Sequence, residues 1–336
     1  MMNCLALTSI LWQGSGELPQ CGAVSLDVAG RGWMRLPKTG IPTDFALHRA
    51  GIGLGFAQGD LHGRVQIGHI QTGGTNSYIG IGGESNVYRI QLASVQYRPI
   101  DSVQLSAGVV EDLWVESGNY TWNYRNIEAT ATEQLAWMER GNVGVTGVWS
   151  SSRLVIAASM HTGEGAFRRE RNAGKNTVLY ARWNVLDAGL LSFELYAQDG
   201  SYGFGSQPNH RAGVRLSSNP VNKSWNAGVS ALQAWGVLGD GAYQPLLLEG
   251  WGAVQPVEWM RLLTRIEHTT FNQQSSTALM MGMSHPIDPQ GNLGIYWKTW
   301  GNSEGWTEIA GSDAAMSTHQ LIVQLDGRFQ QSRLNP

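Results

Sequence analysis

Apolar and polar side chains alternate along much of the chain with a period of two. Residues 50–56 carry an apolar side chain at every second position, a Gln-Gly-Asp turn follows at 58–60, and the alternation resumes over residues 61–67. This is the period of a pleated strand. The pattern predicts a hairpin whose arms each have one apolar and one polar face. Arms of about ten residues match the ~9–11 that cross a bilayer at a tilt, rather than the ~5–6 of a soluble strand.

The same alternation recurs to the end of the chain and gives a count of about sixteen strands. The expected strands cover residues 24–36, 46–57, 61–70, 88–97, 103–109, 143–149, 154–160, 179–185, 190–197, 212–216, 225–231, 246–253, 259–266, 279–283, 293–297 and 321–329. Short turns follow the even-numbered strands and longer polar loops follow the odd-numbered ones, so both termini lie at the short-turn rim. A membrane barrel has this asymmetry, and a soluble sandwich or propeller has no reason to keep it. We therefore expect an all-β chain that forms a transmembrane antiparallel β-barrel.

Composition fits a single domain and narrows the class of protein. The 336 residues include 43 Gly and 14 Trp, only 15% are charged, and the net charge is −3. No apolar run reaches the roughly 18 residues of a membrane-spanning helix. The charge balance lacks the basic footprint of a nucleic-acid binder. Cys4 and Cys21 are too few for a disulfide framework and have no metal-site spacing.

Three segments are expected along the chain. Residues 1–22 form an N-terminal segment whose apolar run has no Lys or Arg before it, so we interpret it as a remnant or absent export signal. Residues 23–329 form the barrel. Residues 330–336 form a C-terminal tail.

Four features of the chain are shared with a known family of channels. They are the sequence Leu-His-Arg-Ala-Gly-Ile-Gly-Leu at 47–54, the even strand count, the long third outer connection and a last strand that ends on Phe329. In these features the chain resembles the bacterial outer-membrane porin superfamily, with general and phosphate-type porins as nearest relatives. It departs from that family in that Phe329 is not the terminal residue.

The resemblance implies a function as well as a fold. It implies an integral protein of the bacterial outer membrane, surrounded by lipid and assembled as a homotrimer, without enzymatic activity or a cofactor. Small hydrophilic solutes or ions would diffuse passively through it. The third outer loop would fold into the lumen and narrow it.

If apolar positions face lipid, the alternation places an unusual number of arginines on the inward face. An Arg facing the middle of the bilayer would cost ~2–4 kcal/mol. The inward set is Arg49, Arg64, Arg89, Arg153, Arg182, Arg211, Arg215, Arg261 and Arg265, with the acids Glu194, Glu249 and Glu267. The alternative for any single Arg is that a polar residue merely points away from lipid. From this set we expect the pore-lining residues to be Arg49, Arg64, Arg89, Arg182, Arg215, Arg261 and Arg265.

The long connection at residues 111–140 is acidic and rich in aromatic residues. It carries six acids against two arginines, and resemblance places it inside the barrel. Its acids, most plausibly Glu116 or Glu128, would face the wall arginines across a constriction and set up a transverse field. With arginines on the rigid wall we expect a weak anion preference. The alternative is a solvated surface lid.

Aromatic residues are expected at the membrane interfaces. On the lipid-facing parity, the residues at the short-turn ends of strands are Phe56, Trp149, Trp183, Trp225 and Phe329, and Trp297 lies near the opposite rim. Large rings of this kind prefer the headgroup zone.

Two other functions compete with the channel. An outer-membrane barrel enzyme of the lipase kind would need a Ser–His pair facing lipid, but Ser159 and His161 have the lumen parity, and the GxSxG match at 301–305 lies in an outer loop. A soluble Trp-rich carbohydrate-binding protein would leave the long strands unexplained. His62 and His69 fall on opposite faces of one strand, so no metal site is expected.

Overall fold

The computed structural model describes residues 20–36, 43–72, 85–122, 124, 129–135, 137–163, 174–186, 190–202, 207–219, 224–237, 241–272, 274–288, 291–302 and 318–331. Strands account for most of this part of the chain. They are β1 (Gln20–Leu36), β2 (Thr43–Gln58), β3 (Leu61–Thr72), β4 (Ser85–Ile100), β5 (Val103–Glu111), β6 (Gly141–Ser150), β7 (Leu154–His161), β8 (Asn176–Leu186), β9 (Leu191–Asp199), β12 (His210–Ser218), β13 (Trp225–Trp235), β14 (Leu246–Val257), β15 (Met260–Phe271), β16 (Gln274–Asp288), β17 (Gly291–Asn302) and β18 (Thr318–Gln331), with a small separate pair β10 (Ser201–Tyr202) and β11 (Gln207–Pro208).

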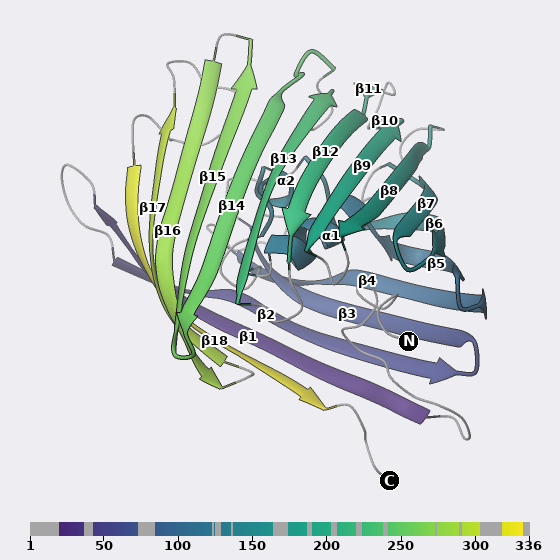
Figure 1. The fold of residues 1–336 in the computed structure, drawn as a ribbon, viewed down its shortest axis with the longest axis horizontal. Helices are drawn as coiled ribbons and strands as arrows, with labels where there is room; N and C mark the ends of the chain where they lie inside the picture. Colours follow the sequence, from purple (N-terminus) through teal and green to yellow (C-terminus); the bar gives the residue numbers. More distant parts are fainter. Residues whose placement is uncertain are drawn as a thin grey trace.

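The strands form one closed antiparallel barrel (Figure 1). Each strand pairs with its neighbour in the order β1 to β9 and β12 to β18, and β1 pairs with β18 to join the two ends. The all-β antiparallel prediction is therefore confirmed. The expected N-terminal segment, residues 1–22, lies mostly outside the described residues, as does the end of the expected tail, and β1 already begins at Gln20.

The period-two pattern places apolar side chains on the outside. On β2, Ile52, Leu54 and Phe56 are 44–48% exposed, while Gly53 and Gly55 between them are buried. The same alternation exposes large apolar side chains around the described wall. Such a surface suits contact with lipid chains rather than with water.

Large rings lie on the outer face where the sequence predicts them. Trp149, Trp183 and Trp225 are 41–52% exposed. The side chain of Phe329 lies outside the described part. Trp259, in the turn between β14 and β15, is a further exposed ring that the pattern did not single out.

One connection differs from the expected alternation of short and long loops. Residues 267–278 were expected to hold a long polar loop, but β15 and β16 continue to a tight turn in which Asn272 has a φ of 53°. His268 and Thr277 pair across these strands and share a hydrogen bond of 2.8 Å. Polar side chains on the outer face interrupt the apolar pattern here, so the sequence predicts a loop, although the hydrogen-bonded pairing of the two strands continues.

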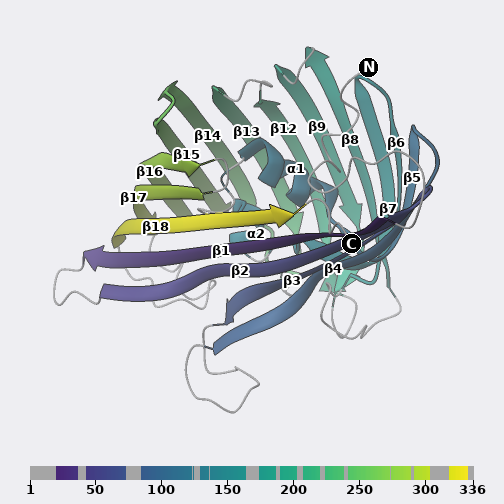
Figure 2. The same cartoon turned by 90° about the horizontal axis from the view of Figure 1, so that it is seen from below.

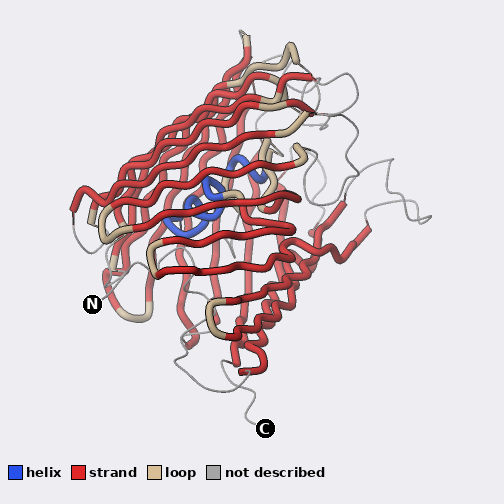
Figure 3. Tube along the Cα trace, turned by 90° about the vertical axis from the view of Figure 1, so that its right-hand side faces the viewer, coloured by secondary structure: helices blue, strands red, loops and turns tan. Residues whose placement is uncertain are grey.

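Two helices lie inside the ring of strands (Figures 2 and 3). They are α1 (Leu113–Trp122) and α2 (Ala131–Gln134), and both belong to residues 111–140, which we call the inner segment. Among the described residues, neither helix has the length and apolar character needed to cross a membrane. The described part of the inner segment lies within the barrel, as the family resemblance implies for the third outer connection.

Candidate functional site

Asp112 fixes the start of the inner segment. Its Oδ1 accepts hydrogen bonds from the backbone N–H groups of Trp114 and Val115, at 3.0 and 3.1 Å. The hydroxyl of Tyr196 on β9 donates to the other carboxylate oxygen at 3.1 Å. The backbone N–H of Asp112 donates to the carbonyl of Arg140 at 2.8 Å, which closes the segment at its base. Asp112 therefore caps α1 and ties it to the wall.

Burial raises the pKa of Asp112 to about 6, although hydrogen bonds from Val115, Tyr196 and Trp114 oppose the shift. The folded protein therefore holds this proton more tightly than the unfolded chain, whose Asp pKa is about 3.9. The stability that this preference contributes is present below about pH 4 and is lost as the pH rises through about 6. At pH 7 the protein carries the cost of a buried carboxylate.

Asp112→Asn should remove this cost and keep the geometry. The amide oxygen can accept the two helix N–H groups, and the amide nitrogen can donate to Tyr196. We expect the variant to be more stable than the wild type at pH 7.5, by on the order of 1–3 kcal/mol, and no more stable at pH 4. Urea unfolding in detergent at the two pH values measures this difference. Asp112→Ala, which loses the cap, is the control and should be destabilised by about 1 kcal/mol at pH 4, where the wild-type carboxyl carries no charge cost. An Asn variant less stable than the wild type at pH 7.5 would refute the assignment.

Beneath α1 the inner wall carries ionisable side chains at one level of the barrel. Residues that lie opposite one another on successive strands β8, β9 and β12 to β15 form this charged row: Arg182, Glu194, Arg215, Ser230, Glu249 and Glu267. Each of them is at most 9% exposed. Charges on an open channel wall would remain hydrated, so the burial of this row shows that the lumen is filled on this side.

Arg215 on β12 is the central contact between the charged row and α1. Its Nη1 donates to Glu194 Oε2 at 2.8 Å and to the carbonyl of Trp114 at 3.2 Å. Its Cζ lies 3.9 Å from the centre of the Trp114 ring. Glu194 also accepts from Ser117 Oγ at 2.6 Å. Gly213 leaves room for the indole, because a Cβ there would lie 3.0 Å from Trp114 Cη2.

Arg265 on β15 holds the far part of the inner segment. Its Nη2 lies 2.9 Å from Glu249 Oε1 and 2.6 Å from Glu267 Oε1. Its Nη1 donates to the carbonyl of Ala129 at 2.7 Å, and its Cζ lies 5.2 Å from the Trp122 ring centre. Arg215 and Arg265 therefore contact two different parts of the inner segment, at Trp114 and at Ala129.

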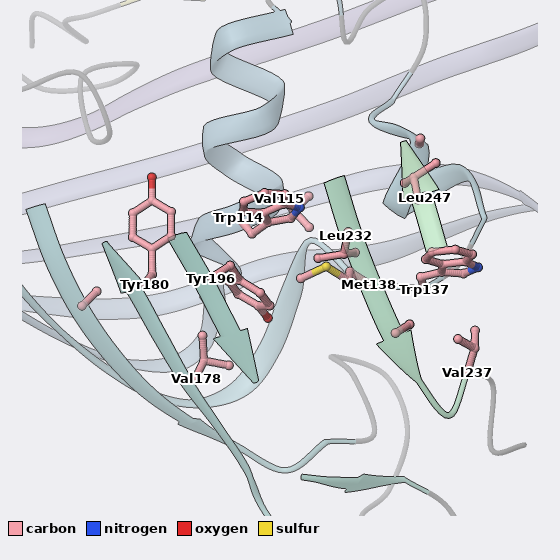
Figure 4. Packing of buried hydrophobic residues seen from close by; sticks show 13 residues of the cluster. Trp114, Val115, Trp137, Met138, Val178, Tyr180, Tyr196, Leu232, Val237 and Leu247 are labelled. Carbon is pink, nitrogen blue, oxygen red and sulfur yellow. The ribbon is translucent and has the colours of Figure 1, made fainter. Parts of the chain in front are cut away.

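Apolar packing also fixes the inner segment to the wall (Figure 4). From the segment, Trp114, Val115, Trp137 and Met138 are buried against wall residues. Those wall residues are Ala157, Val178, Tyr180, Tyr196, Leu232, Ala234, Val237 and Leu247. A second cluster joins Trp122 and Tyr124 of the segment to Trp251, Ala253, Leu263, Met280, Tyr296 and Ile322. Burying a large apolar side chain contributes ~1.5–3 kcal/mol, so the segment is seated by packing as well as by charge.

At the base of the inner segment lies a second charged group, the root cluster, made of Arg64, Gln66, Glu111, Glu116 and Arg140. Arg64 pairs with Glu111, and Arg140 pairs with Glu116. Gln66 Oε1 accepts from both guanidinium groups, at 3.1 and 3.0 Å. The four charged side chains are 11–22% exposed, whereas the side chains of Arg215 and Glu194 in the charged row are 2% and 0% exposed. This cluster therefore presents two positive and two negative groups side by side.

The arginines expected to line the pore fall into different surroundings. Arg182, Arg215 and Arg265 lie on the inner wall, but they are 6%, 2% and 2% exposed beneath the inner segment. Parity identifies the face of a strand but not what covers it. Arg261 is less buried, and its Nε donates to Gln255 Oε1 at 3.1 Å.

For two further candidates the backbone register gives the position. Arg49 lies opposite position 29 of β1, and Arg89 lies opposite the buried Gly68 of β3, so both occupy inward positions. Their side chains lie outside the described part, and so does Glu128.

Two expectations need correction. Glu116 was expected to face the wall arginines across the opening, but it pairs with Arg140 of its own segment, next to Gln66. The pair forms because the segment leaves β5 and returns to β6, which are neighbours, so its two ends meet. Arg153 was expected to point inward, but it lies exposed in the turn between β6 and β7.

Lys298 is an inner-wall cation that the sequence reasoning missed. It lies opposite the buried Met280, and its Nζ donates to Gln134 Oε1 of the inner segment at 3.3 Å. The apolar alternation of this strand was followed only to Trp297. Extending the same parity by one residue would have found it.

The residues that could form an enzyme or a metal site have other surroundings. Ser159 and His161 are buried on the inner wall, as parity predicted, and Ser159 Oγ accepts a hydrogen bond from Thr146 at 2.9 Å. Most of the GxSxG match at 301–305 lies outside the described residues. Within the described ranges, His, Cys, Asp and Glu side chains form no group of three that could hold a metal ion.

Comparison by sequence gives no relatives. No family model matches the chain, and no curated protein matches it.

Comparison by structure finds outer-membrane barrels. OmpF of Salmonella typhi, in complex with daunomycin, has a TM-score of 0.67 and 11% identity, covering 93% of this chain and 98% of that one. An anion-selective porin from Comamonas acidovorans has a TM-score of 0.65 and 9% identity, covering 92% and 99%. OmpT of Vibrio cholerae in its trimer form has a TM-score of 0.58 and 10% identity, covering 92% and 100%. The chain therefore has the porin-like fold over most of its length.

Proposed function

We propose that the protein is a porin of the bacterial outer membrane that lets small hydrophilic solutes or ions diffuse passively. The observation that carries this proposal is a closed barrel with apolar side chains outside and a folded segment seated inside. An outer face of this kind suits lipid, and a narrowed polar interior suits hydrated solutes. The likeness to solved porins supports it.

The proposed constriction has a fixed side and a selective side. The charged row and the two apolar clusters hold the inner segment against β7 to β9 and β12 to β18. The opening then lies between the segment and the remaining wall, which carries Arg64 and the inward positions of Arg49 and Arg89 on successive strands β2 to β4. In this arrangement Arg182, Arg215 and Arg265 position the constriction and do not touch the solute.

A weak anion preference follows from this arrangement. The root cluster is neutral as a whole, so the arginines at positions 49 and 89 leave a positive excess on the β2 to β4 wall. Charges nearest the permeating ion act at short range, whereas surface charges are screened beyond ~8 Å at physiological salt. The net charge of −3 therefore does not decide the preference.

We further propose a homotrimer. The outward face of β13 carries the small side chains Ala227 and Ala231, which allow close approach of another sheet. The solved OmpT structure of Vibrio cholerae is described as a trimer form.

The triple variant Arg49→Ala, Arg64→Ala and Arg89→Ala should shift the channel toward cations. It removes three positive charges from the β2 to β4 wall, including the ion-pair partner of Glu111, so the positive excess on this wall is lost. Reversal potentials in a KCl gradient across a planar bilayer measure the shift. Arg153→Ala, which removes an exposed arginine in a turn, is the matched control. An unchanged reversal potential in the triple variant would show that these residues do not border the opening.

A further inference from the structure

The half of the charged row on β8, β9 and β12 contains more positive than negative charge. Arg182 and Arg215 lie on either side of Glu194, directly opposite it in the register. Both carboxylate oxygens of Glu194 are already bound, one to Arg215 and the other to Ser117. Arg182 is 6% exposed and has no carboxylate in contact among the described residues. A buried charge without a partner costs several kcal/mol, so this guanidinium calls for a counter-ion.

The printed contacts of Arg182 are with neutral groups. Its Nη2 donates to Ser192 Oγ at 3.2 Å, and Ser192 Oγ in turn donates to Asn184 Oδ1 at 2.9 Å. Its Cζ lies 5.7 Å from the ring centre of Tyr120, which covers it from the side of α1. None of these groups carries a negative charge.

Hydrogen-bond donors without partners occur on β8 and β12, the two strands that flank β9. Within the described part of the chain, Nε of Arg182, Nε of Arg215 and Oγ of Ser217 are buried and unbonded. Ser217 is 3% exposed and lies opposite Ser192 on the neighbouring strand. Opposed residues have Cβ atoms ~4.5–5.5 Å apart, and residues two positions along a strand are ~6.7 Å apart, so arginine side chains reach across this patch.

The chemistry of these groups selects the ligand. Both guanidinium groups can only donate hydrogen bonds, and the serine hydroxyl can turn to donate. Water needs acceptors as well as donors, whereas an anion is satisfied by donors alone and neutralises the excess charge. A site enclosed by a sheet and a tyrosine ring suits an ion of small radius.

We propose that a small inorganic anion of the halide class, chloride in the cell, binds beneath Tyr120 between Arg182, Arg215 and Ser217. The anion completes the charge balance of the charged row and stabilises the seat of α1. The site is separate from the opening, so the proposal does not depend on channel activity.

Anomalous diffraction from crystals of the detergent-solubilised protein grown in sodium bromide tests the proposal. We expect a bromide peak within hydrogen-bonding distance of the Arg182 guanidinium and of Ser217 Oγ. Arg182→Met should lose the peak. Ser217→Ala, which keeps both charges and disturbs the fold less, should reduce its occupancy. Arg153→Met is the control with an arginine removed elsewhere.

Two results would overturn the proposal. One is wild-type density that contains only water at this place. The other is a peak of unchanged height in both Arg182→Met and Ser217→Ala, which would mark an adventitious ion only. Neither result bears on conductance, so the proposed channel is tested independently.

Discussion

Arg215→Met should lower the free energy of unfolding by about 3–5 kcal/mol, the usual cost of breaking a buried ion pair by removing one partner. Glu194, which is fully buried, would lose its ion-pair partner and retain its contact with the hydroxyl of Ser117. The carbonyl and the ring of Trp114 would lose their guanidinium contact as well. Urea unfolding of the refolded protein in lipid vesicles, followed by tryptophan fluorescence, measures the loss.

The double variant Arg215→Met and Glu194→Leu distinguishes the net contribution of the ion pair from the cost of leaving one buried charge without its partner. Replacing both members by apolar side chains of similar volume is often nearly neutral, so most of the stability should return. Arg153→Met, in an exposed turn, should stay within about 0.5 kcal/mol of the wild type. A loss below about 1 kcal/mol in the single variant would mean that Arg215 does not hold the segment.

Replacing residues 113–139 by a short Gly/Ser linker between β5 and β6 should raise the single-channel conductance several-fold. β5 and β6 are paired along their length, so a short connection can join them without disturbing the barrel. The replacement removes α1 and α2 from the lumen and exposes the charged row to water, where its charges become hydrated.

In this variant, conductance reports the width of the opening, and resistance to proteolysis reports whether the barrel is folded. The barrel should still resist proteolysis in detergent, because its ladder of strand pairs is intact. Conductance equal to that of the wild type, with the barrel folded, would show that the inner segment does not narrow the channel.

The strands could be predicted because each one has an outer and an inner face in the barrel, which gives the period of two. Parity also placed Arg182, Arg215 and Arg265 on the inner wall. It could not show that the inner segment covers these residues, because covering depends on contacts such as Trp114 on Arg215, made between residues 101 positions apart. For the same reason, the pattern of inward arginines predicted a basic wall open to the lumen, although the inner segment covers part of that wall.

Other differences between prediction and structure arise where the sequence pattern is local but the contact joins residues that are far apart in the chain. Glu116 and Arg140 are 24 residues apart, and they meet because neighbouring strands bracket the inner segment. The β15–β16 hairpin was cut short because His268 and Thr277 interrupt the apolar face while the ladder continues. In each case the sequence pattern identified which positions are polar, whereas the order of the strands in the barrel determines which residues meet.

Whether the barrel is an open water-filled channel can be measured by single-channel recording of the wild-type protein in a planar lipid bilayer. We predict discrete, ohmic conductance steps in KCl and a reversal potential in a salt gradient of the sign for weak anion preference. Protein that inserts as a folded barrel and yields no conductance steps would show that the barrel is not a channel.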